Sequence, residues 1–176
     1  MTADPHLLDR RFESMDVDRD RERFFESMLT DLAEVLETNV GIDLAEGFIA
    51  LVGHRTAAAM NADYRAAAGK DRLNVAEVAA ALVDLKRRIE GGFRVESLAD
   101  DRIVLVNDRC PFGRAADGKP SLCMMTSNVF GRIAADNLGY AHVLLEETIA
   151  KGAQGCRVVI HLDGRGPTGE GREYFG

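Results

Sequence analysis

The chain has 176 residues and a net charge of −7, and 46% of its residues are hydrophobic while 29% are charged. This composition is too apolar for intrinsic disorder, and the length suits one domain that buries its own core. The acidic balance, with no concentrated run of Lys and Arg, argues against direct binding to nucleic acid.

The N-terminal half predicts an arm followed by three helices. Residues 1–19 mix charges of both signs with few apolar positions, which is typical of a flexible arm. Apolar residues recur at helical spacing over 20–38 and again over 43–67, and the first half of this second helix is apolar enough to be buried. A third helix over 75–89 begins with a capping box formed by Asn74 and Glu77.

The C-terminal half predicts two β-hairpins joined by a helix. Short β-type runs over 93–98 and 102–108 form the first hairpin, and runs over 141–149 and 156–162 form the second. Between the hairpins, a loop rich in turn residues leads into a helix over 121–138.

The expected fold class is therefore α+β. The N-terminal helices pack on a four-stranded antiparallel sheet made of two hairpins joined by a helix. One domain spans 20–162, and the Gly-rich polar segment 163–176 is predicted to be a flexible tail.

Three cysteines are the main candidates for chemistry. Cys110 begins the loop after the first hairpin, Cys123 lies in the first turn of the connecting helix, and Cys156 starts the last strand. No apolar run approaches the ~20 residues of a membrane span and no secretory signal is visible, so we expect a cytoplasmic protein with reduced thiols. If strands 102–108 and 156–162 are neighbours, the thiols meet at one edge of the sheet, where a cation would hold them as thiolates.

A metal held by three thiolates needs a further ligand. Asp108, His142, Glu146 and Glu147 are near in the predicted topology, and we select Glu147 as the fourth metal ligand. A carboxylate or imidazole would complete a tetrahedral zinc site, whereas three thiolates with an open iron would suit an iron-sulfur cluster. Cysteines at such irregular spacing are also compatible with packing as small buried hydrophobic residues, so these alternatives stay open here.

Three segments carry a resemblance to a known family: FRVESLADDRIVLVNDRCPFG, PSLCMMTSNVFGRIAADNLG and ETIAKGAQGCRVVIHL. Over residues 24–162 the chain resembles the 4-vinyl-reductase-like superfamily, particularly its methanogen output domain type. The resemblance implies a sensor or output domain, commonly dimeric, in which Cys110, Cys123 and Cys156 are candidate ligands for zinc or an iron-sulfur cluster. Relatives often have a ligand at the position that Thr148 occupies here, which leaves the fourth ligand open.

The resulting hypothesis is a stand-alone sensor domain and not an enzyme. It would dimerise through its N-terminal helices, bind a metal or cluster and a small-molecule effector, and act on a separate signalling or transcription protein. Two alternatives remain. One is a tetrapyrrole-related enzyme of the vinyl reductase type, which the superfamily's name suggests, and the other is a metal-free ligand-binding adaptor with inert thiols.

Overall fold

A computed structural model describes residues 20–164, 166, 167 and 169–176, with the backbone alone at 114 and 115. The predicted arm, 1–19, lies outside the described residues. The helices are α2 (Arg21–Val40), α3 (Ile42–Ala68), α4 (Val75–Arg88) and α5 (Cys123–Leu138), and the strands are β1 (Arg94–Ala99), β2 (Arg102–Asn107), β3 (Tyr140–Glu147), β4 (Cys156–His161) and β5 (Arg172–Phe175). Short 3-10 turns η1 (Gly113–Ala116), η2 (Pro120–Leu122) and η3 (Ile149–Lys151) lie in the connections.

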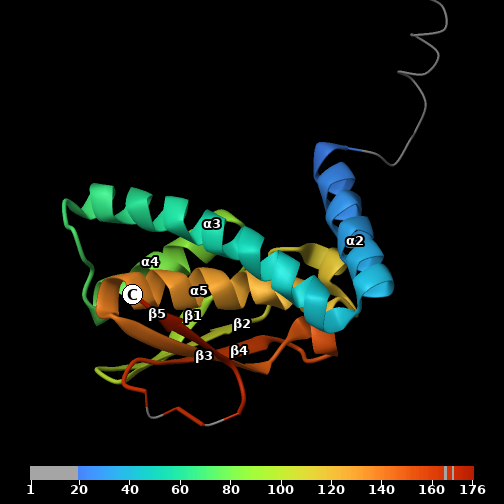
Figure 1. Cartoon of the computed structure of the whole chain (residues 1–176). Helices are drawn as coiled ribbons and strands as arrows, with labels where there is room; N and C mark the ends of the chain where they lie inside the picture. Colours follow the sequence, from blue (N-terminus) through green and yellow to red (C-terminus); the bar gives the residue numbers. More distant parts are fainter. Residues whose placement is uncertain (1–19, 165, 168) are drawn as a thin grey trace, which may run out of the picture.

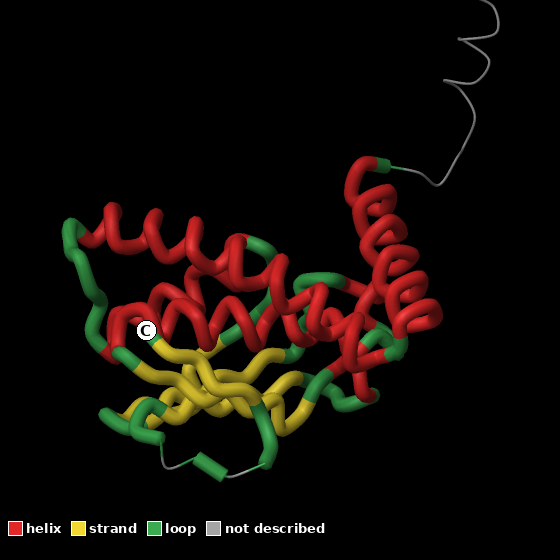
Figure 2. The backbone as a smooth tube through the Cα atoms, viewed as in Figure 1, coloured by secondary structure: helices red, strands yellow, loops and turns green. Residues whose placement is uncertain are grey.

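The described strands form one antiparallel sheet in the order β1-β2-β4-β3-β5. The two predicted hairpins are β1–β2 and β3–β4, and they meet through the pairing of β2 with β4. Helices α3, α4 and α5 lie on one side of this sheet, while α2 lies beside the N-terminal end of α3 (Figures 1 and 2). The structure confirms the predicted α+β class.

The sheet has five strands where the sequence predicted four. The fifth, β5, belongs to the segment that we expected to be a flexible tail, and it pairs with β3. Tyr174 explains the docking of β5, because its ring lies so close to Gly131 of α5 that a Cβ there would come within 2.1 Å of the ring. The Tyr174 hydroxyl also lies 2.9 Å from the Ser127 hydroxyl. The C-terminal strand is thus part of the packed domain.

Local sequence signals account for the helix ends. The capping box predicted at Asn74 and Glu77 is present, with each side chain accepting a hydrogen bond from the other residue's backbone N–H. Asp20 caps α2 by accepting from the backbone N–H of Arg23 at 2.8 Å. Gly41, with a φ of 80°, separates α2 from α3 at the predicted stop.

The core lies between α5 and the sheet, and α3 closes it through small residues. Gly53 allows the two helices to approach closely, since a Cβ there would lie 2.8 Å from the Cβ of Asn128. The prediction that the first half of α3 is buried was therefore wrong in one respect. Its small residues face the core, whereas large side chains such as Phe48 and Leu51 are exposed by 50% and 65%.

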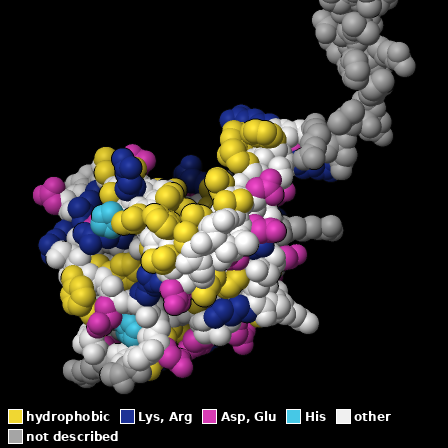
Figure 3. Space-filling model, turned by 45° about the vertical axis from the view of Figure 1, so that its right-hand side comes forward, with side chains coloured by type: hydrophobic (Ala, Val, Ile, Leu, Met, Phe, Trp, Pro, Cys, Tyr) yellow, Lys and Arg dark blue, Asp and Glu magenta, His cyan; other side chains and the backbone are white. Residues whose placement is uncertain are grey.

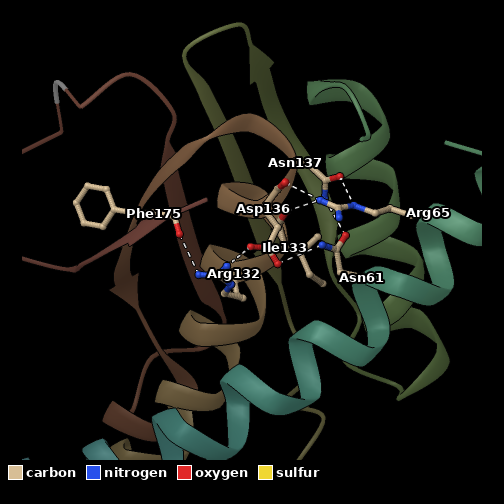
Figure 4. A network of polar contacts seen from close by, with 7 residues as sticks. All are labelled: Asn61, Arg65, Arg132, Ile133, Asp136, Asn137 and Phe175. Atoms are coloured by element: carbon tan, nitrogen blue, oxygen red, sulfur yellow. Dashed lines mark hydrogen bonds and ion pairs between the residues drawn. The ribbon is translucent and has the colours of Figure 1, made fainter. Parts of the chain in front are cut away.

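A buried polar cluster joins the C-terminal ends of α3 and α5 (Figure 4). The amide of Asn137 donates to Asn61 and accepts from Arg65 and from the backbone N–H of Leu73, at 2.8 to 2.9 Å. Arg65 also donates to the carbonyl of Asp136 at 2.5 Å. Because Asn137 is only 4% exposed, these partners have little access to water and hold the helices in one register.

Replacement of Tyr174 tests whether the C-terminal strand is structural. We expect Tyr174→Ala to lower the free energy of unfolding by about 2–4 kcal/mol, because it empties the space beside Gly131. Phe175→Ala is the matched control on the same strand, since Phe175 is 65% exposed and should contribute about 1 kcal/mol or less. Urea unfolding measures both. Equal losses in the two variants would contradict the docking of β5 through Tyr174.

Candidate functional site

The three cysteines come from separate elements and line one small cavity. Cys110 lies in the loop after β2, Cys123 is the first residue of α5, and Cys156 is the first residue of β4. All are free thiols, and together they line a cavity of about 20 Å³. This volume is enough for about one water molecule or a single ion.

Asn107 positions the backbone around two of these thiols. It ends β2 directly opposite Cys156, and its side-chain oxygen accepts from the backbone N–H of Cys156 at 2.8 Å. Its amide nitrogen donates to the carbonyls of Gly91 and Arg109, at 2.9 and 2.6 Å. The side chain is 5% exposed, so a single buried amide ties the start of the Cys110 loop to the start of β4.

A buried lysine lies beside the thiols, and sequence analysis missed it. Lys86 of α4 is 2% exposed, and its ammonium donates to the Thr126 hydroxyl at 2.8 Å. It also lies over the rings of Phe93 and Phe130, 5.6 and 5.2 Å from their centroids. The signal was available, because Lys86 follows the core residue Leu82 by four positions and so shares its face of the helix.

Burial opposes charge on every titratable group of this site. It lowers the pKa of Lys86 to about 8, although thiolate charges at the three cysteines would raise it again. It also raises the pKa of Cys123 to about 11 and moves the pKa values of Cys110 and Cys156 in the same direction. In the free protein at neutral pH the thiols are therefore protonated and poorly nucleophilic, and a soft cation would have to displace their protons.

The predicted fourth ligand lies outside the cavity. Glu147 is exposed, and Glu146 forms an ion pair with Arg157 on the surface. Asp108 is exposed too, while His142 is buried elsewhere and its Nε2 lies 2.6 Å from the carbonyl oxygen of Glu170. Among the described residues, no group of three or more His, Cys, Asp or Glu side chains stands in metal-ligating geometry.

Thr148 is a polar residue that does line the thiol cavity. It is 4% exposed, and within the described part of the chain its hydroxyl makes no hydrogen bond of regular geometry. The hydroxyl does approach the Cys123 thiol and offsets part of the rise in its pKa. A buried hydroxyl without a proper partner is costly, so the cavity has a polar group ready for an occupant.

A larger pocket shares a wall with the thiol cavity. It has a volume of about 440 Å³ and lies between α3, α5, β3 and β5. Cys123, Leu145 and Thr148 line both spaces. Arg172 and Glu46, which both line the larger pocket, form an ion pair at 3.1 Å. Cys123 thus adjoins a space large enough for a small organic molecule.

Helix α2 packs against the loop that connects Cys110 to Cys123. Gly113 lies so close to Glu26 that a Cβ there would come within 2.6 Å of the carboxylate. Lys119 forms an ion pair with Glu34 at 3.1 Å, and the backbone N–H of Ser121 donates to Glu37 at 3.4 Å. Movement of this loop would therefore change its direct contacts with α2.

Comparisons with known proteins identify the fold and the family. The structure is similar to that of a trafficking protein particle complex subunit 3 from Naegleria fowleri covalently bound to palmitic acid, with a TM-score of 0.56 over 88% of this chain and 97% of that one. At 10% identity this likeness shows a shared fold alone. No curated protein sequence matches the chain. None of the helices that the structure describes combines the length and apolar composition needed to span a membrane.

The family model described as methanogen output domain 1 matches residues 28–161, which include all three cysteines. This match confirms the resemblance predicted from the sequence. The chain belongs to the methanogen output domain 1 family.

Proposed function

We propose that this chain is a regulatory sensor domain that holds one soft metal ion through Cys110, Cys123 and Cys156. The observation that carries the proposal is the convergence of three thiols from three separate elements on one cavity. The buried hydroxyl of Thr148, which lines the same cavity and approaches the Cys123 thiol, supports a polar occupant. Because the described thiols are not in ligating geometry, metal binding would require them to move closer together.

The size of the cavity favours zinc over an iron-sulfur cluster, whereas thiolate sulfur suits both. Thiolate sulfur is the preferred donor of Zn²⁺ in structural sites. A cavity of about 20 Å³ accommodates a single ion, whereas a cluster of several iron and sulfur atoms would need a much larger opening. When bound, the ion would keep the sulfurs as thiolates and cross-link the Cys110 loop, α5 and β4.

The signal would leave the site through the loop between Cys110 and Cys123. Metal binding would reposition this loop, and its contacts with Glu26, Glu34 and Glu37 would pass the change to α2. A small molecule in the adjoining 440 Å³ pocket would act on the same site through Cys123. We propose a cytoplasmic binding domain that is read by a separate signalling or transcription protein, and not an enzyme.

The metal content of the purified protein tests the proposal. We expect about one zinc ion per chain in protein purified without oxygen, because three thiolates from one cavity suffice to hold it. Cys156→Ser should lose most of this zinc and lower the melting temperature, since it removes one ligand. Met124→Leu is the matched control, because Met124 is a sulfur residue that lines the larger pocket but not the thiol cavity.

Elemental analysis, an absorption spectrum and the intact mass of the denatured chain distinguish the outcomes. Iron together with sulfide, and visible absorption, would show that the site holds an iron-sulfur cluster instead of zinc. A Cys156→Ser variant with full metal content and unchanged stability would remove the basis of the proposal. A covalent acyl adduct on Cys123 would also remove the basis of the proposal. This chain would then carry a covalent acyl group, as the trafficking subunit carries palmitic acid.

We further propose that two copies pair through the N-terminal helices. Large apolar side chains are exposed along α2 and α3, and Figure 3 shows hydrophobic side chains gathered over this face. These residues are Phe24, Phe25, Met28, Leu32, Val35, Leu44, Phe48, Leu51 and Val52. Monomers seldom leave so continuous an apolar face in water, and a second copy would cover it with a surface of the same kind.

Replacement of Leu32 tests this interface. Leu32 is 52% exposed on α2, and we expect Leu32→Asp to convert a dimer into a monomer because it places a carboxylate in the apolar contact. Light scattering after gel filtration gives the mass. Leu98→Asp is the control, since Leu98 is 45% exposed but lies on the edge strand β1. A monomeric unmodified protein, or a Leu32→Asp variant that remains dimeric, would contradict the interface.

A further inference from the structure

Within the part of the chain that the structure describes, the ammonium of Lys86 is a buried cation without a carboxylate partner. Among the described residues, no Asp or Glu lies within ion-pair distance of its Nζ. Its contacts are a neutral hydroxyl, that of Thr126, and the faces of two rings, Phe93 and Phe130. These contacts hold the ammonium in place but supply no full negative charge.

A buried charge without a counter-charge is destabilising, so an anion that comes close to Lys86 would offset this cost. The groups near it that can become negative are the thiols of Cys110, Cys156 and Cys123. Phe93 and Thr126, which contact the ammonium, also line the thiol cavity. The cation and the thiols therefore belong to one site.

We infer that Lys86 is the charge-balancing residue of the thiol site and makes the site selective for a divalent ion. The inference rests on the proposed function and specifies the class of ion. Three thiols that bind a divalent ion release three protons to solvent, with no change of oxidation state, and leave one net negative charge. The single positive charge of Lys86 cancels it inside the low-dielectric interior.

Ions of other charge leave the site unbalanced. A monovalent ion such as Cu(I) with three thiolates carries two negative charges, of which Lys86 cancels one. Trivalent arsenic forms a neutral complex with three thiolates, releasing water from arsenite, and the Lys86 charge then stays uncompensated. The buried cation thus discriminates against both classes, although thiolate sulfur suits all three ions.

Removal of the charge at position 86 tests this inference. The probes are Zn(II), measured by competition with a chromophoric chelator, and arsenite, measured by loss of free thiols under reducing conditions. We expect Lys86→Met to weaken Zn(II) binding by about tenfold or more, because one nearby buried charge is lost, and to leave arsenite binding unchanged or tighter. Methionine fills a similar volume among the apolar neighbours, so the variant is expected to fold.

Two further variants keep the test decisive. Lys151→Met removes an exposed cation near Cys123, and its effect on Zn(II) should be much smaller because solvent screens the charge. Lys86→Arg retains the positive charge and should preserve the preference for Zn(II) over arsenite even if both affinities fall.

The outcomes separate this inference from the proposed function. An unmodified protein that binds neither probe would overturn the metal site itself, and the inference with it. An unmodified protein that binds Zn(II), with a Lys86→Met variant whose affinities for both probes change by the same factor, would overturn only the role of Lys86. A fall in Zn(II) affinity that is equal in Lys86→Met and Lys151→Met would also overturn it.

Discussion

The antiparallel pairing of β2 with β4 is the constraint on which the site depends. It joins the two hairpins into one sheet and places the end of β2 next to the start of β4. Asn107 closes this end of the pair, and Gly155 is required beside it because a Cβ there would lie 2.2 Å from the Asn107 carbonyl oxygen. Since α5 crosses the same face of the sheet, its first residue, Cys123, completes the cavity with Cys110 and Cys156.

The charge distribution around this cavity is unusual for a packed interior. Buried lysines are rare unless they are paired, yet Lys86 has only a hydroxyl and two aromatic faces as partners among the described residues. Burial also keeps the thiols protonated. These features become mutually favourable when a divalent ion converts the thiols to thiolates, which is why we assign cation and thiols to one function.

Sequence patterns predicted those parts of the structure that depend on local physics. Helix caps such as Asn74 with Glu77, and the short β-type runs of the two hairpins, are decided by neighbours along the chain. The docking of β5 was missed because Tyr174 needs the surface of Gly131, a contact between distant segments. The exposure of Phe48 on α3 was missed because the helix packs through Gly53, and apolar content alone does not indicate which face is buried.

The candidate site was predicted only in part for the same reason. The three cysteines could be named from the sequence, and the adjacency of β2 and β4 that we considered is present in the fold. Glu147 was chosen because the predicted topology places it near the cysteines. The pairing of β3 with β4 is irregular between Leu145 and Glu147, however, and Glu147 is exposed. Lys86 lies on a different element from every cysteine, so only the tertiary structure brings it to the thiols.

The most direct test of a single site built from Cys110, Cys123 and Cys156 is X-ray absorption at the zinc edge on the zinc-loaded protein. We expect three sulfur neighbours at about 2.3 Å together with one lighter atom. Two or fewer sulfur neighbours, or a shell of nitrogen and oxygen alone, would contradict it.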